Sequence, residues 1–139
     1  MKFASPLQHA MLGIVHAVVF SDGEIRPSEI AWIQSVVRKH NSFRDLNGEE
    51  FAMACAEVLD EFNSAPLKVV MGRWVQALSG YSASRSIAFE LAVDAVLADG
   101  EIADIEEGML LYLAKAWGIS DRERELAYRD ALDRKAKGQ

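Results

Sequence analysis

Apolar residues recur at steps of three and four along most of the chain, which is the period of an amphipathic α-helix. Polar or glycine-containing breaks separate these stretches, and no stretch alternates as a β-strand does. The pattern therefore predicts an all-α fold of about seven helices in one domain, residues 1–139, with no linker long enough to divide it. Three of the expected helices have bounds set by polar breaks: about Ser5 to Phe20, Pro27 to about Asn41, and Ser82 to about Ala98.

Capping sequences mark several of the expected helix ends. Asn47 is followed three residues later by Glu50, and Ser120 by Glu123, which is the spacing of a capping box. Gly118 follows the apolar stripe of the sixth helix, where a left-handed C-cap is favoured. These signals agree with the helix order that the apolar period gives.

The chain contains an internal repeat of an acidic turn. Residues 22–29 read D-G-E-I-R-P-S-E and residues 99–106 read D-G-E-I-A-D-I-E, so both share the pattern D-G-E-I-x-x-x-E. The copies lie 77 positions apart, and in each an apolar helix runs into the turn and another helix leaves it. We therefore expect a pseudo-two-fold duplication of a helix–turn–helix unit within the domain.

The repeated turn has a structural and a functional interpretation. In the structural one, Asp caps the turn, Gly takes a left-handed conformation and Glu favours the next helix N-terminus. In the functional one, the carboxylates bind a divalent cation, Ca²⁺ or Mg²⁺, because these cations prefer oxygen ligands. The candidate metal ligands are Asp22, Glu29, Asp99 and Glu106, with Asp94, Glu24 and Glu101 as second choices.

The turn matches only the second half of an EF-hand loop. The positions of the first two acidic EF-hand ligands hold Val18 and Phe20 in one copy, and Ala95 and Leu97 in the other. These apolar residues continue a helix, so an EF-hand loop is excluded and any cation site must be completed by other groups.

Composition and charge narrow the function classes. With 15 Lys and Arg against 21 Asp and Glu, the formal net charge of −6 disfavours a nucleic-acid partner. Between residues 86 and 114 there are seven acids and no Lys or Arg, which predicts an acidic surface. A single cysteine excludes an internal disulfide and suits the cytoplasm. No apolar run reaches the roughly 18 residues of a membrane span, and no targeting segment is evident.

The repeated turns also carry a family resemblance. Two D-G-x-I-x-x-x-E turns between helices, half a domain apart, resemble those of the tellurite-resistance protein B (TerB)-like family. Residues 113–120, L-A-K-A-W-G-I-S, resemble the ending of that family's second repeat. The resemblance extends from about Ala4 to Leu132, nearly the whole chain.

Membership of that family implies an all-helical fold with pseudo-two-fold symmetry and an acidic metal site. The residues that match are Asp22, Glu29, Asp99 and Glu106, with Asp94 in the helix before the second turn. Ala17 stands where the second copy has Asp94, so the two halves are not equivalent. The family is associated with bacterial tellurite resistance and with general stress or envelope complexes.

Other reactive residues are expected to serve the structure. His9 and His16 lie seven positions apart in the first helix without further zinc ligands nearby, and we expect them to be partly exposed. Cys55 falls on the apolar stripe of the third helix and is expected in the core. The tryptophans are expected in the core as well: Trp32, Trp74 and Trp117.

The leading hypothesis from the sequence is a non-enzymatic, cytoplasmic TerB-like domain of a bacterial stress response. Such a domain binds a divalent cation, or presents its acidic face to a protein partner in an assembly that can include membrane-associated proteins. The alternative is a purely structural or protein-interaction helical domain whose Asp-Gly turns are helix caps. A hydrolase with metal-bound carboxylates would need a cleft and an activated water, which the sequence does not place.

Overall fold

The all-α expectation is confirmed. The computed structural model describes residues 2–24, 26–97 and 102–137, and helices account for 77% of these residues, with no strand among them. The helices are α1 (Pro6–Val19), α2 (Pro27–Arg38), the short 3₁₀ helix η1 (Asn41–Phe43), α3 (Gly48–Glu61), α4 (Leu67–Ala77), α5 (Ser82–Leu97), α6 (Asp104–Trp117) and α7 (Asp121–Lys137).

Local hydrogen bonds explain why the predicted caps hold. The Asn47 side chain accepts from the Glu50 N–H at 2.8 Å, and the Glu50 carboxylate accepts from the Asn47 N–H at 2.9 Å. Ser120 and Glu123 exchange the same two bonds before α7. Gly118 ends α6 with a φ of 68°, a left-handed conformation that favours glycine.

The expected end of the second helix was wrong by three residues. α2 stops at Arg38 and is followed by η1, whose N-cap is His40. The His40 Nδ1 atom accepts from the Ser42 N–H at 3.1 Å, and the turn brings Phe43 into the core, where it is 1% exposed. The chain leaves the helix before Asn41, and the burial of the Phe43 ring compensates for the helical hydrogen bonds that are not formed. The helical period of the sequence could not predict this exchange.

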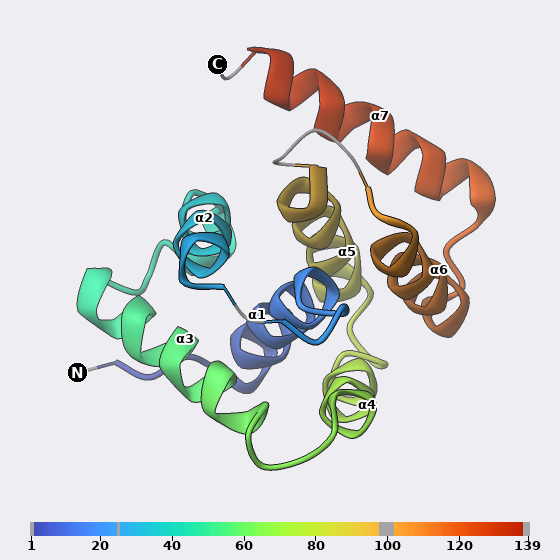
Figure 1. The fold of residues 1–139 in the computed structure, drawn as a ribbon. Coiled ribbons are helices and arrows are strands. Elements are labelled where there is room, and N and C mark those ends of the chain that lie inside the picture. Colours follow the sequence, from blue (N-terminus) through green and yellow to red (C-terminus); the bar gives the residue numbers. More distant parts are fainter. Residues whose placement is uncertain (1, 25, 98–101, 138–139) are drawn as a thin grey trace.

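Two helices, α1 and α5, pack against each other at the centre of the molecule (Figure 1). Every residue of α1 from Ala10 to Val19 is buried. α2, α3 and α4 pack on α1, whereas α6 and α7 pack on α5; α2 also reaches α5, and α6 also reaches α1. The two central helices are therefore covered on most sides, and the hydrophobic core follows their length.

The helix order agrees with the 77-residue spacing of the acidic turns. α1, α2 and α3 correspond in order to α5, α6 and α7, and Pro27 and Asp104, the first residues of α2 and α6, lie 77 positions apart. In each half the second helix packs on both central helices and the third packs on its own central helix. α4 has no counterpart, and a duplication of the chain stays a prediction.

Burial confirms most of the residue expectations and overturns two. Cys55 and Trp74 lie in the core, at 1% and 4% exposure. His9 is partly exposed, as expected, and Trp117 is partly buried against the core. His16 is fully buried rather than partly exposed, because α2, α3, α4, α5 and α6 all pack on α1. Trp32 is 49% exposed rather than in the core, so an aromatic ring stands at the surface of α2.

None of the helices in the described part of the chain combines the length and apolar character that crossing a membrane requires.

Candidate binding cleft

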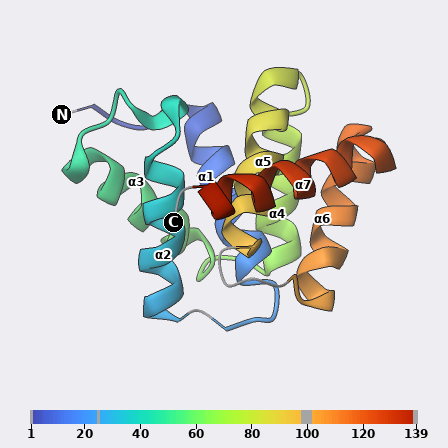
Figure 2. The same cartoon turned by 90° about the horizontal axis from the view of Figure 1, so that it is seen from above.

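The two repeated turns lead into helices that begin at the same end of the molecule. α2 and α6 both start there, on either side of the ends of α1 and α5 (Figure 2). Residues of both turns line one cleft with a volume of about 680 Å³, which we call the acidic cleft. Its acidic residues are Asp22, Glu29, Asp104 and Glu106.

Apolar side chains form most of the remaining surface of the acidic cleft. Val19, Ile33 and Ala95 line it and are buried, at 8%, 1% and 6% exposure. Trp32 and Ile105 also line it but are 49% and 55% exposed, so they stand at its open side. An apolar base with charged groups around it is the usual make-up of a binding site.

Arg26 holds the acids of the first turn. One guanidinium nitrogen donates to Glu29, and the other donates to Glu24 and lies 3.5 Å from the Asp22 Oδ2 atom. The hydrogen bond with Glu29 is the main cause that raises the pKa of Arg26, and the charges of Glu24 and Asp22 raise it further. The three first-turn acids predicted as metal ligands therefore share an internal cation.

Asp22 also meets the expectation of the structural interpretation. Its Oδ1 atom accepts from the N–H of Glu24 at 3.0 Å, which stabilises the turn. Gly23 has a φ of 85°, the left-handed conformation that such a turn requires. The Asp22 bond lies within the turn itself, and among the described residues no side chain caps the N-terminus of α2, whose N-cap residue is Arg26.

The second turn differs from the first at one informative position. Ala103 stands 77 residues after Arg26, so this copy carries no guanidinium there. The Glu106 carboxylate accepts from the Ala103 N–H at 2.9 Å and so caps α6. Asp99 and Glu101, which the sequence predicted as ligands, lie outside the described residues.

The remaining candidate ligands lie apart from the acidic cleft. Asp94 forms an ion pair with Arg134 of α7 at 2.6 Å, on a neighbouring groove. Glu24 pairs with Arg26, and its side chain is 65% exposed. Within residues 2–24, 26–97 and 102–137, no three potential metal-ligating side chains gather at one point. The structure therefore brings Asp22, Glu29 and Glu106 to one cleft but not to one coordination sphere.

Sequence reasoning did not identify Arg26, Trp32 or Ile105 as parts of this site. A signal for Arg26 was present, because it is the one basic residue in either copy of the repeated turn. A signal for Trp32 was also present, because Trp32 lies off the stripe of Ile33 and Val37 that α2 buries.

The reactive groups elsewhere in the core are not poised for chemistry. Burial raises the pKa of the Cys55 thiol to about 12, so the sulfur stays protonated near neutral pH. Burial lowers the pKa of His16, and its Nδ1 atom bonds to the Leu12 carbonyl oxygen at 2.7 Å. Neither group lines the acidic cleft.

Comparisons of this chain with protein-family models, with curated proteins and with solved structures found no match.

Proposed function

We propose that this chain is a non-enzymatic binding domain whose recognition surface is the acidic cleft. The observation that carries the proposal is that both repeated turns contribute acids to one cleft, beside an apolar base and the exposed ring of Trp32. The ligand that suits this surface is a protein segment that carries a basic side chain next to apolar ones. Of the two roles that the resemblance to the TerB-like family implies, cation binding and protein binding, this proposal takes protein binding.

The size of the cleft favours a protein segment over a lone ion. Its volume of about 680 Å³ falls within the roughly 300–1,000 Å³ of pockets that bind organic groups. One water molecule occupies about 30 Å³ of liquid, so a single hydrated ion fills only a small part of such a cleft. Apolar side chains of a partner can cover Val19 and Ile33 while a basic side chain meets the acids.

Arg26 is a competitor that an incoming basic group can displace. Its guanidinium is solvent-exposed, with a side-chain exposure of 47%, and ion pairs of this kind are individually weak. A partner's Arg or Lys can therefore take over the carboxylates of Glu29 and Asp22 while Arg26 turns to solvent. Such an exchange keeps the charge of the site balanced before and after binding.

A titration monitored by amide NMR shifts tests the proposal with defined probes. We expect acetyl-Leu-Arg-Leu-amide to bind weakly, with a Kd of about 1 mM, and to shift residues at the starts of α2 and α6. The peptide acetyl-Leu-Glu-Leu-amide is expected to cause no saturable shifts there, because the acids repel it. The binding should weaken as salt is raised.

The matched variants are Glu29→Gln/Asp104→Asn in the cleft and Glu49→Gln/Asp60→Asn on the exposed side of α3. Both change the net charge by the same amount, but only the first is expected to abolish the shifts caused by the arginine peptide. Equal effects of the two variants, or no saturable shifts in the unmodified protein, would contradict the proposal.

A divalent cation is the second candidate ligand, and one observation favours it. Asp104 and Glu106 line the same cleft as Asp22 and Glu29, so carboxylates from both repeated turns share one cleft. Carboxylates that share a cleft repel one another, and a bound cation lowers that repulsion. Ca²⁺, Mg²⁺ or Mn²⁺ could serve in this way at the cleft.

Replacement of Arg26 tests the cation hypothesis directly. We expect Arg26→Gln to raise the affinity for Mn²⁺ about tenfold in a calorimetric titration of chelator-treated protein, because the first-turn acids lose their internal cation. Arg44→Gln, an exposed substitution with the same change in net charge, should leave the affinity unchanged. An Arg26→Gln protein that binds Mn²⁺ no better than Arg44→Gln would exclude these acids as cation ligands.

A further inference from the structure

A second groove adjoins the acidic cleft along α2. It has a volume of about 480 Å³ and lies between α2, α5 and the end of α7. Its apolar lining includes Val36, Leu91 and Leu97. Among the described residues, its lining has three positive and two negative side chains, so we call it the basic groove: Lys39, Arg134 and Lys135 against Glu90 and Asp94.

Two of the basic side chains are held in place by α5. Arg134 pairs with Asp94 at 2.6 Å, and the Lys135 ammonium donates to the Leu97 carbonyl oxygen at 3.0 Å, at the last residue of α5. These contacts hold the end of α7 over the groove and leave Lys39 on the opposite edge, on the α2 side. The acidic cleft, in contrast, carries four acids and one arginine.

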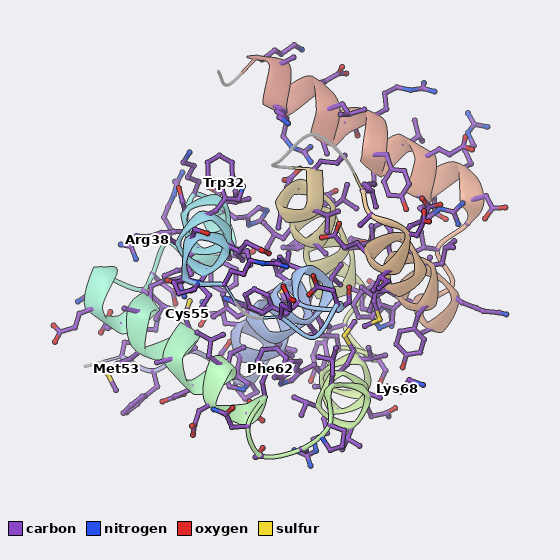
Figure 3. All side chains as sticks on the ribbon, viewed as in Figure 1. Trp32, Arg38, Met53, Cys55, Phe62 and Lys68 are labelled. Atoms are coloured by element: carbon purple, nitrogen blue, oxygen red, sulfur yellow. The ribbon has the colours of Figure 1, made fainter. Side chains whose placement is uncertain are left out.

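Trp32 joins the two sites. It lines both the acidic cleft and the basic groove, and its ring is 49% exposed. It projects from α2 on the side of the helix that faces the end of α7 (Figure 3). A half-exposed tryptophan between two apolar hollows is the kind of side chain that anchors a protein interface.

We propose that the acidic cleft and the basic groove form one binding channel for an amphipathic helix of a protein partner. The channel follows α2, with Trp32 at its middle, and its charge changes from negative to net positive along its length. A complementary helix carries basic residues at the end that enters the acidic cleft and acidic residues at the end beside Lys39. This inference rests on the proposed function and adds the shape and polarity of the partner.

The helix dipole sets the direction of the bound segment. A helix is most stable with acids in its first turn and basic residues in its last turn. The acidic N-terminal end of the partner helix then lies beside Lys39 and its basic C-terminal end lies in the acidic cleft, so it runs antiparallel to α2. Glu29 and Lys39 are ten positions apart, a rise of about 15 Å, so a helix of about 14 residues spans both sites.

A displayed peptide library with two fixed charge orders tests the inference. Each member is a 14-residue helix with randomised apolar residues on one face. One half carries Glu-Glu at the start and Lys-Arg at the end, and the other half carries the same residues exchanged. We expect selection on the full chain to enrich the Glu-first order at least tenfold over the reversed order, and the Kd of the enriched peptides to follow the same preference.

The outcomes separate this inference from the proposed function. If both charge orders are enriched equally and the arginine tripeptide still binds at α2 and α6, the channel polarity is wrong and the proposed function stands. If no peptide of either order is enriched and the tripeptide also fails, both are wrong. Enrichment of the reversed order likewise overturns the inference.

Lys39→Glu checks that the basic groove reads the acidic end of the peptide. We expect this variant to weaken the selected Glu-first peptides about fivefold, because attraction is replaced by repulsion at one end. Lys68→Glu on α4 has the same charge change and should not alter the Kd. Equal effects of the two variants would place the peptide outside the basic groove.

Discussion

Gly13→Ala is expected to lower the free energy of unfolding by about 3 kcal/mol, the upper part of the range for an overpacked core. A Cβ atom at Gly13 would lie 2.4 Å from two ring atoms of Trp74. Real Cβ contacts are essentially never this short, so the Trp74 ring or the two helices would have to shift. Urea unfolding followed by circular dichroism measures the effect. We expect the slope of the unfolding free energy against urea concentration to stay unchanged.

Two other helical glycines serve as controls for this substitution. Apart from the backbone of its own helix, no atom of the described residues lies within 4 Å of a Cβ atom built at Gly72 or Gly108. Alanine at these positions is expected to stabilise the protein by about 0.5–1 kcal/mol, because glycine lowers helix stability. In a Trp74→Leu background, Gly13→Ala should cost less than about 1 kcal/mol, because the ring that it meets is gone. If Gly13→Ala lowers the free energy of unfolding equally in the Trp74→Leu protein, the strain does not come from the contact between α1 and α4.

His16 is expected to make the fold sensitive to mild acid. Burial holds its pKa below the ordinary value of 6.5, and its Nε2 atom has no partner among the described groups. The unfolded chain therefore binds a proton more readily than the folded one. The stabilisation that depends on a neutral His16 is fully present above pH 6.5. It is lost as the pH falls from 6.5 toward the pKa of His16 in the folded protein, and the free energy of unfolding drops by up to about 2 kcal/mol at pH 5.

Unfolding measured at pH 7, 6 and 5 checks this expectation. His16→Leu should reduce the loss between pH 7 and pH 5, whereas His40→Gln, which changes a residue outside the core, should keep it. The acids Asp45 and Glu50 have lowered pKa values and add to acid sensitivity only nearer their ordinary values of 3.8 and 4.5. If the His16→Leu protein loses as much stability between pH 7 and pH 5 as the unmodified protein, His16 is not the cause of the acid sensitivity.

Local chemistry explains why the helix ends could be predicted from the sequence. The capping bonds of Asn47 and Ser120, and the left-handed Gly118, involve residues only a few positions apart. Because the partners are so close in the sequence, their spacing alone is enough to predict the capping bonds. The wrong end of α2 shows the opposite case, because the burial of Phe43 depends on helices that lie elsewhere in the chain.

The site could be predicted only in part, for a related reason. The repeat predicted Asp22, Glu29 and Glu106 as site residues, and all three line the acidic cleft. It could not predict that they share one cleft, because this depends on how α1 and α5 pack against each other. Trp32 was expected in the core because tryptophan is mostly buried in proteins, but it lies off the buried stripe of Ile33 and Val37 and is half exposed. Arg26 stands at a position where the two copies of the turn differ, so the pattern that they share does not include it.

The central position of α1 has a consequence for how the protein is made. α1 is synthesised before the helices that bury it, and α5, which covers much of it, begins only at residue 82. Until α5 emerges, α2, α3 and α4 can pack on α1, but the apolar side of α1 that α5 covers has no native contact. The nascent chain thus exposes this hydrophobic surface until α5 has been synthesised, and exposed hydrophobic surface is the condition in which nascent chains engage chaperones or aggregate.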